Sequence, residues 1–187
     1  MKNFILGLLA IALNAFGLEG RVISVADGDT LTVLTSDKQQ VKIRLSGIDT
    51  PEKNQAYGTK AKQALSGKVF GKQVEVKSSG KDRYGRTIGD VYYAGRWINL
   101  EMVREGWAWH YKAYSKDNKL AQAEVDARGA KKGLWADSNP VPPWEFRRGG
   151  KSSESKASEK TDKAIIGYWL NESSGVRHNS NCQHYKN

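Results

Sequence analysis

Four short segments, far apart in the chain, carry residue types that suit hydrolysis of a phosphodiester bond. They are residues 27–30, Arg44, residues 49–52 and residues 82–86, which read DGDT, R, DTPE and DRYGR. The carboxylates of Asp29, Asp49 and Glu52 are oxygen donors that can hold a hard divalent cation and a water. The guanidinium groups of Arg44 and Arg86 can bind a phosphate diester from two sides. Together these residue types indicate cleavage of nucleic acid.

The charge of the chain points to a polyanionic partner. The 187 residues include 30 Lys and Arg against 20 Asp and Glu, which gives a formal net charge of +10. This excess favours nucleic acid over an anionic membrane as the partner. Charge alone is weak support, because many soluble proteins are basic without a specific reason. At this length, with 39% apolar residues, we expect one modest domain with appendages.

The first 17 residues have the pattern of a signal peptide. Lys2 precedes an apolar run from Phe4 to Phe16, and residues 15–17 read AFG, which suits a cleavage site. An uncleaved membrane anchor is the alternative, but a span needs about 20 apolar residues and this run is shorter. A signal peptide predicts a secreted or periplasmic location.

The composition of the chain changes after residue 146. Residues 147–164 are expected to form a flexible linker, because nearly all of them are small, polar or charged. A short segment of unknown role follows at residues 165–187. It contains His178, Cys182 and His184, one ligand short of the four that a closed zinc site needs. An exposed tail with a free thiol is the alternative, and the single cysteine excludes a disulfide within the chain.

Residues 18–146 are expected to form one domain. Strands are predicted at residues 21–25, 30–35, 40–46, 73–77 and 87–93, with a short one at 97–98. Helices are predicted at residues 55–69, from an N-cap at Asn99 to Gly106, and at 116–131. Elements in this order predict an α+β fold in which helices pack on a small Greek-key barrel.

The third predicted strand positions one of the arginines. Val41, Ile43 and Leu45 alternate with Lys42 and Arg44, so Arg44 is expected on the face opposite the apolar row. A solvated strand arginine is the alternative. The acidic turn five residues later favours a site instead.

At this point the chain resembles the thermonuclease (staphylococcal nuclease-like) family over about residues 20–136. The resemblance rests on four segments in the family's order, VISVADGDTLTV, IRLSGIDTPE, KDRYGR and NLEMVREGWAW. It implies an OB-fold, which is a five-stranded Greek-key barrel, with about three packed helices. It also implies calcium-dependent hydrolysis of DNA and RNA with little sequence specificity.

The resemblance assigns roles to the acidic residues. Asp29, Asp49 and the backbone carbonyl of Thr50 match the calcium ligands. Glu52 matches the carboxylate that orients or deprotonates the attacking water. Asp27 matches an acidic position that supports the site.

The remaining roles implied by the resemblance concern the substrate. Arg44 and Arg86 match the two arginines that bind the phosphate and stabilise the charge growing on it. Further contacts with the nucleotide are expected from Arg83, Tyr84, Tyr111 and Tyr114.

One of the expected tyrosine contacts departs from the family pattern. Tyr114 aligns with a family tyrosine, whereas Lys112 stands at the other such position, for which Tyr111 substitutes. Between Tyr92 and Tyr114 aromatic residues are dense. A place in the core is the expectation for any one of them, and an exposed subset could stack bases. His110 lies outside the matched set and is expected to be a surface or structural residue.

Two other functions fit part of the sequence. An OB-fold whose catalysis has decayed would still bind nucleic acid, but it would be expected to have lost one of the five matched side chains, and none is lost. A basic protein that binds envelope polymers would explain the charge but not the acidic turns. We expect a monomeric exported nuclease, with the preference between DNA and RNA left open.

Overall fold

The computed structural model describes residues 17–149, 168–171 and 176–179. Nearly all of the predicted signal peptide, most of the predicted linker, and Cys182 and His184 of the zinc alternative lie outside the described residues. No helix in the described part of the chain has the length and apolar character needed to cross a membrane.

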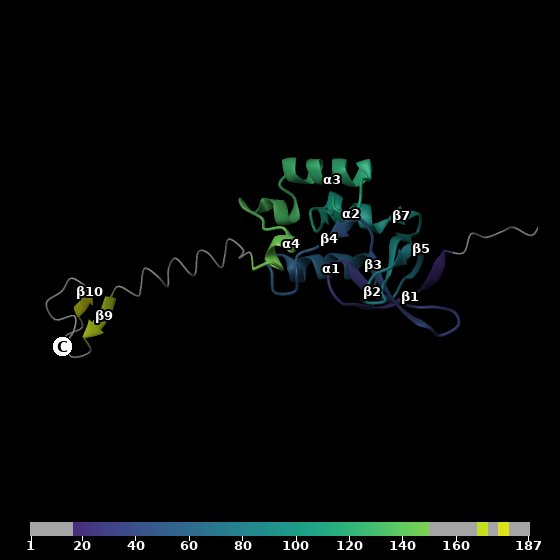
Figure 1. Cartoon of the computed structure of the whole chain (residues 1–187), viewed down its shortest axis with the longest axis horizontal. Helices are drawn as coiled ribbons and strands as arrows, with labels where there is room; N and C mark the ends of the chain where they lie inside the picture. The colour runs from purple at the N-terminus through teal and green to yellow at the C-terminus, as the bar shows by residue number, and fades with distance from the viewer. Residues whose placement is uncertain (1–16, 150–167, 172–175, 180–187) are drawn as a thin grey trace, which may run out of the picture.

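Five strands close into a small barrel (Figure 1). They are β1 (Leu18–Val25), β2 (Thr30–Leu34), β3 (Gln40–Leu45), β5 (Gln73–Lys81) and β6 (Thr87–Tyr93). Their order is β3-β2-β1-β5-β6 with antiparallel neighbours, and a parallel pairing of β3 with β6 closes the barrel. This is the predicted OB-fold, and the predicted extra strand is present as β7 (Arg96–Trp97), which extends the sheet beyond β6.

The barrel interior is filled by the apolar rows that the sequence predicts. In β3, Ile43 and Leu45 are completely buried, whereas Lys42 is exposed and Arg44 is only partly covered. Alternation along this strand therefore turns Arg44 away from the core, as expected. The barrel side chains and those of the packed helices form one continuous hydrophobic cluster.

Three main helices pack on the barrel, as predicted (Figure 1). They are α1 (Gly58–Val69), α2 (Ile98–Arg104) and α3 (Asn118–Gly129). Asp117 caps α3, since its Oδ1 accepts the N–H groups of Lys119 at 2.7 Å and Leu120 at 3.1 Å. The predicted N-cap role of Asn99 is wrong. Asn99 lies inside α2, where its buried amide accepts the N–H of Val91 and donates to the carbonyl of Ser46.

Six short elements were not predicted. A two-stranded pair joins β4 (Ile48–Asp49) to β8 (Trp109–His110), with Asp49 opposite Trp109. After α3 come a single 3-10 turn, η1 (Gly133–Ala136), and the helix α4 (Pro143–Phe146). Near the end of the chain β9 (Tyr168–Asn171) pairs with β10 (Val176–Asn179) as an antiparallel hairpin.

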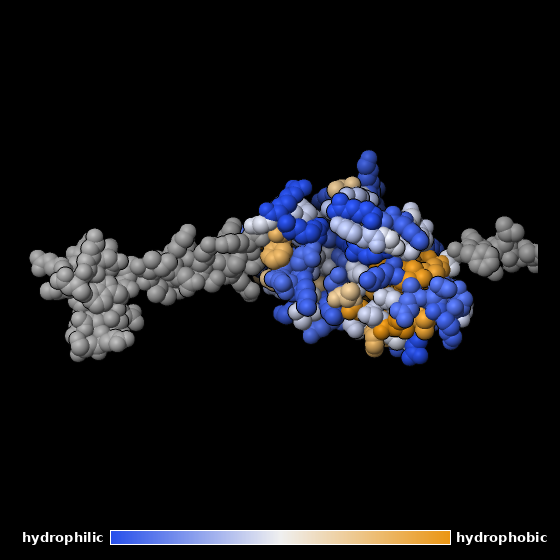
Figure 2. Space-filling view, turned by 60° about the horizontal axis from the view of Figure 1, so that its bottom comes forward, coloured by the Kyte–Doolittle hydropathy of each residue, from blue (hydrophilic) through white to orange (hydrophobic). Residues whose placement is uncertain are grey.

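On the face that Figure 2 presents, the surface of the domain is mainly hydrophilic, with smaller apolar areas in more than one place. This agrees with a chain of net charge +10 and with a domain whose large apolar side chains are mostly inside.

Candidate active site

Two buried carboxylates form the centre of the candidate site. Asp29 precedes β2 and is 5% exposed, and Asp49 ends β4 and is 1% exposed. Arg44 of β3 joins them, with Nη1 3.0 Å from Asp29 Oδ2 and Nη2 2.9 Å from Asp49 Oδ1. The same guanidinium donates to the carbonyls of Leu45 and Ile48, so the position of Arg44 is fixed by four groups. The barrel thus brings Asp29 together with Arg44 and Asp49, which follow it by 15 and 20 positions in the sequence.

Thr50 fixes the orientation of the Asp29 carboxylate. Its backbone N–H and its hydroxyl donate to Asp29 Oδ2 at 2.9 Å and 2.8 Å. This contact requires a glycine beside Asp29, because a Cβ on Gly28 would come within 2.8 Å of the side chains of both Thr50 and Ala61. Gly28 therefore allows residues 27–30 to pack closely against residues 49–52.

Burial disfavours the charged forms of the acids in this cluster. Burial first, and then the nearby negative charge of Asp29, raise the pKa of Asp27 to about 6. Asp27 also accepts the N–H of Asp29 at 3.0 Å, which places it in support of the site. Burial raises the pKa of Asp49 as well, against the opposing effects of Arg147 and Arg44. Such a cluster favours a bound cation.

A second arginine, Arg147, joins this cluster and was not predicted from the sequence. Arg147 Nη2 lies 2.8 Å from Asp49 Oδ2, and Arg147 Nη1 lies 2.6 Å from Glu52 Oε1. The pair with Asp49 raises the already high pKa of Arg147. Arg147 is the first residue of the predicted linker, and here it joins the two acids of the DTPE segment.

The segment that carries Arg147 is tied to the domain at several points. Gln55 donates to the carbonyl of Val141 at 2.6 Å and accepts the N–H of Glu52 at 3.0 Å. Pro143 begins α4, a position that suits proline because no helical N–H is lost there. The sequence does carry a signal for this segment, because Trp144, Phe146 and two arginines follow the Pro-Pro pair. They stand next to a polar, charged stretch, which favours a linker instead.

Arg86 reaches the cluster from the loop between β5 and β6. Its Nε donates to Asp82 at 2.6 Å, and its Nη1 lies 3.5 Å from the hydroxyl of Thr30, which in turn donates to Asp29. The Arg86 side chain is 28% exposed. Asp82 therefore orients Arg86 while leaving Nη2 for an external anion.

The predicted nucleotide contacts lie in two places. Tyr84, 68% exposed, stands beside Arg86 with the guanidinium of Arg83 4.9 Å from its ring. Tyr111 and Tyr114 contact each other with ring centroids 4.8 Å apart, and Tyr114 is 78% exposed. These are the positions of the predicted residues, and their roles in binding stay predictions.

His110 proves to be buried, at 3% exposure, in β8. Burial lowers its pKa below the usual value, so it is mainly neutral at pH 7. Its backbone N–H is 3.3 Å from Glu124 of α3, which makes it part of the packing between β8 and α3.

The oxygen donors of the cluster suit a hard cation. Asp29 and Asp49 meet around Arg44, and Thr50 follows Asp49 directly, which gives carboxylate and carbonyl oxygens of the kind that calcium binds. Within the described residues no group of three or more His, Cys, Asp or Glu side chains converges as a ready metal site. The chemistry of the donors fits a divalent ion, with Arg44 and Arg147 now balancing their charge.

Comparison with known proteins shows the family of the chain. Residues 42–137 match the family model described as "Staphylococcal nuclease homologue". The chain is 51% identical over 128 residues to an "Uncharacterized endonuclease" of Haemophilus influenzae, covering 68% of this chain and 72% of the relative. It is 47% identical over 131 residues to an "Uncharacterized endonuclease" of Escherichia coli, covering 70% and 85%. It is 41% identical over 145 residues to a "Micrococcal nuclease" of Shigella flexneri, covering 72% and 83%.

A closed five-stranded barrel with acids and arginines gathered on one edge defines a hydrolase of the endonuclease class. The chain belongs to the staphylococcal nuclease homologue family, and nucleic acid is its substrate class.

Proposed function

We propose that this protein is an exported, calcium-dependent nuclease that hydrolyses phosphodiester bonds in DNA and RNA with little sequence specificity. The supporting observation is the continuous chain of contacts from Arg86 through Asp29, Arg44 and Asp49 to Glu52, in which Thr30 and Arg147 are the links. Side chains from distant segments thus meet in one place, as the predicted reaction requires. Export rests on residues 1–17, and we propose that the mature domain acts as a monomer.

In this proposal the acids hold the cation and prepare the water. Asp29, Asp49 and the carbonyl of Thr50 would hold calcium, which supplies positive charge beside the phosphate when bound. Glu52, whose side chain is 40% exposed, orients or deprotonates the water that attacks phosphorus. Arg147 must leave Glu52 or share it for this to occur.

The arginines act on the phosphate. Nη2 of Arg86 is left over from the contacts of this side chain with Asp82 and Thr30, and it stabilises negative charge as it grows on the equatorial oxygens. Arg44 has an Nε–H and one Nη2 hydrogen beyond its contacts with the acids, so it can donate to the same phosphate. Contacts with phosphate rather than with base edges predict weak sequence preference and binding that falls steeply with salt.

A cleavage assay tests this function. Heat-denatured DNA and structured RNA are incubated with the purified full chain, with calcium or with a calcium chelator, and the products are separated on a gel. We expect both substrates to be cleaved in calcium only. Binding without cleavage in calcium would contradict the proposal and indicate a decayed binding module. Cleavage in excess chelator would contradict the cation requirement.

A further inference from the structure

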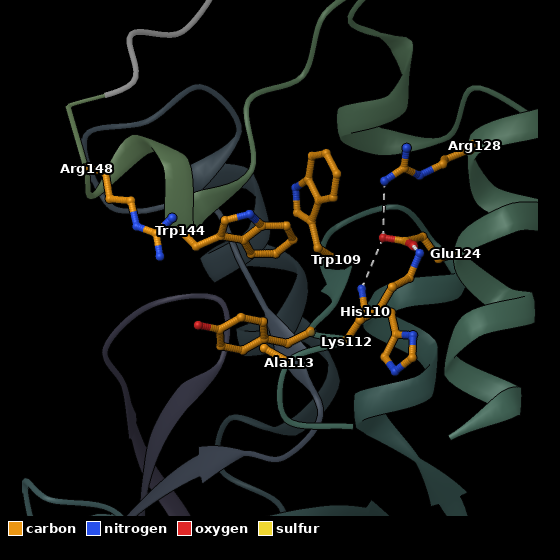
Figure 3. Close-up of a pocket in the computed structure, with 9 residues that line it drawn as sticks. Trp109, His110, Lys112, Ala113, Glu124, Arg128, Trp144 and Arg148 are labelled. Atoms are coloured by element: carbon orange, nitrogen blue, oxygen red, sulfur yellow. Dashed lines mark hydrogen bonds and ion pairs between the residues drawn. The ribbon is translucent and has the colours of Figure 1, made fainter. Parts of the chain in front are cut away.

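A cavity of about 320 Å³ lies between α3 and the segment that carries α4 (Figure 3). In the close-up, Trp144 and Arg148 face it from the α4 segment, and Glu124 and Arg128 face it from α3, with Trp109 between the two groups. Ligand pockets occupy about 300–1,000 Å³, so this cavity is large enough for one small ring system. The family match ends at residue 137, before the α4 segment that forms this wall.

Aromatic rings make up one side of the cavity. The rings of Trp144 and Tyr111 are parallel, 3° apart in angle and 5.4 Å between centroids. Trp144 also meets Trp109 edge-on at 5.5 Å. These contacts hold Trp144 in a fixed orientation while its side chain stays only half-buried. A fixed, partly open aromatic face is suited to stacking a planar ligand.

The charges around the cavity select an anionic ligand. Glu124 is 2% exposed and is matched by Lys112 at 3.3 Å and Arg128 at 3.4 Å. Arg148 lines the same cavity, and no ion pair of its guanidinium is found among the described residues. Within the described part of the chain, the cavity therefore combines an aromatic face with a guanidinium that is open to an anion.

The cavity adjoins the carboxylate site. Asp49 of β4 stands opposite Trp109 of β8 in the antiparallel pair, so one pair of residues carries both sites. On the other side, α4 and the residues after it carry Trp144 and Arg148 toward the cavity and Arg147 toward Asp49. A strand whose phosphate lies at the carboxylates can thus extend a neighbouring nucleotide over the cavity.

We propose that this cavity is a nucleotide subsite, in which a base of the substrate strand stacks on Trp144 and a neighbouring phosphate contacts Arg148. The inference rests on the proposed function for the identity of the ligand as nucleic acid. It adds a base-binding element supplied by the segment beyond the matched family region.

Equilibrium binding in excess chelator tests the subsite without cleavage. The full chain is titrated with a labelled single-stranded oligonucleotide, and with an abasic strand of equal length that keeps the phosphates but lacks the bases. We expect the wild type to bind the base-containing strand about tenfold more tightly, since one stacked base contributes at least that much. Trp144→Ala should remove most of this difference, because Tyr84 and Tyr114 lie outside the cavity and keep any base contact of their own. Trp144→Phe should retain more of it.

Two further variants separate the subsite from a general change in shape. Arg148→Ala should weaken binding of both strands, because it removes a phosphate contact and leaves the aromatic face intact. Phe70→Ala is the matched control, since Phe70 is 56% exposed and does not line the cavity. It should bind like the wild type.

The outcomes distinguish this inference from the proposed function. Equal binding of the two strands by the wild type, or equal effects of Trp144→Ala and Phe70→Ala, would overturn the subsite even if cleavage is normal. Base-dependent binding that requires Trp144, in a protein that fails to cleave, would support the subsite and refute the nuclease function. Complete competition by inorganic phosphate alone would show a simple anion site and would also overturn the subsite.

Discussion

The two sides of Asp49 are built differently, although each supplies an arginine to the same carboxylate. On the barrel side, Arg44 projects from β3, is 15% exposed and contacts two acids and two carbonyls. On the other side, Arg147 follows the four-residue helix α4, is 42% exposed and contacts two acids. Arg44 lies within the family match at residues 42–137, and Arg147 lies beyond it.

This difference gives the two arginines different roles, one in the stability of the site and the other in what the site binds. A buried charge needs its partner for the domain to be stable, because an unpaired buried ion costs several kcal/mol. A partly exposed ion pair contributes little to stability and can open readily. We therefore infer that Arg44 holds the site together, whereas Arg147 modulates what the acids bind.

The largest effects are expected on the cleavage rate, for substitutions of the residues that act on the phosphate and on the water. Arg86→Ala on the barrel side and Glu52→Ala beside Arg147 should each lower the rate of DNA cleavage by about 10²–10³-fold, by loss of charge stabilisation and of water activation. Single-turnover kinetics at saturating calcium measures this. Arg104→Ala, which removes an exposed charge from α2, is the control. Turnover near the wild-type rate in either site variant would contradict the assigned roles.

Stability should distinguish the two arginines next. Arg44→Met leaves Asp29 and Asp49 buried without their shared cation, and we expect a loss of about 3–5 kcal/mol in the free energy of unfolding. Arg147→Met should cost no more than about 1 kcal/mol, because its pairs are partly exposed. Urea denaturation in chelator measures both values. Equal losses would show that the two regions are structurally equivalent.

A smaller effect is expected on calcium affinity. Arg147→Met removes a cation that occupies Asp49 and Glu52, so calcium should bind about fivefold more tightly. The increase in thermal stability at fixed calcium concentration reports this affinity without any turnover. If the variant binds calcium more weakly than the wild type, Arg147 supports the ion instead of competing with it.

The smallest effect is expected on the pH dependence of stability, through His110 of β8, the strand that pairs with β4 beside Asp49. Burial lowers the folded-state pKa of His110, with Lys112 lowering it further and Glu124 and Asp117 opposing. The stability gained from the neutral ring is present above pH about 6.5 and is lost as the pH falls through the folded-state pKa. His110→Gln should flatten the stability profile between about pH 6.5 and pH 5. Thermal melts across this range measure it, and an unchanged acid slope would assign that slope to other groups.

The barrel part of the site follows from the sequence because its signals are local. Alternation in β3 predicts that Arg44 leaves the core, and the turns around Asp29 and Asp49 are marked by glycine and proline. Proximity of these segments came from the resemblance, since no local pattern reports which distant turns meet. The N-cap assigned to Asn99 failed because the residue serves a buried contact between α2 and β6, which spacing does not reveal.

The other part of the site could not be predicted in this way. The pair β4–β8 has only two residues in each strand, too few for a periodic pattern. α4 has four residues and stands next to a polar stretch, so composition assigns Arg147 to a linker. What fixes it is tertiary, namely the bond from Gln55 to Val141 and the packing of Trp144 on Tyr111.

Calcium binding by the wild type and by Asp49→Asn tests the central claim most directly. Asp49 is the carboxylate that both regions share, and the substitution keeps its shape while removing its charge. Calorimetric titration of the full chain without substrate should show one calcium ion bound by the wild type and none by the variant. Equal binding by the two proteins, or no binding by a wild type that cleaves DNA in excess chelator, would contradict the account.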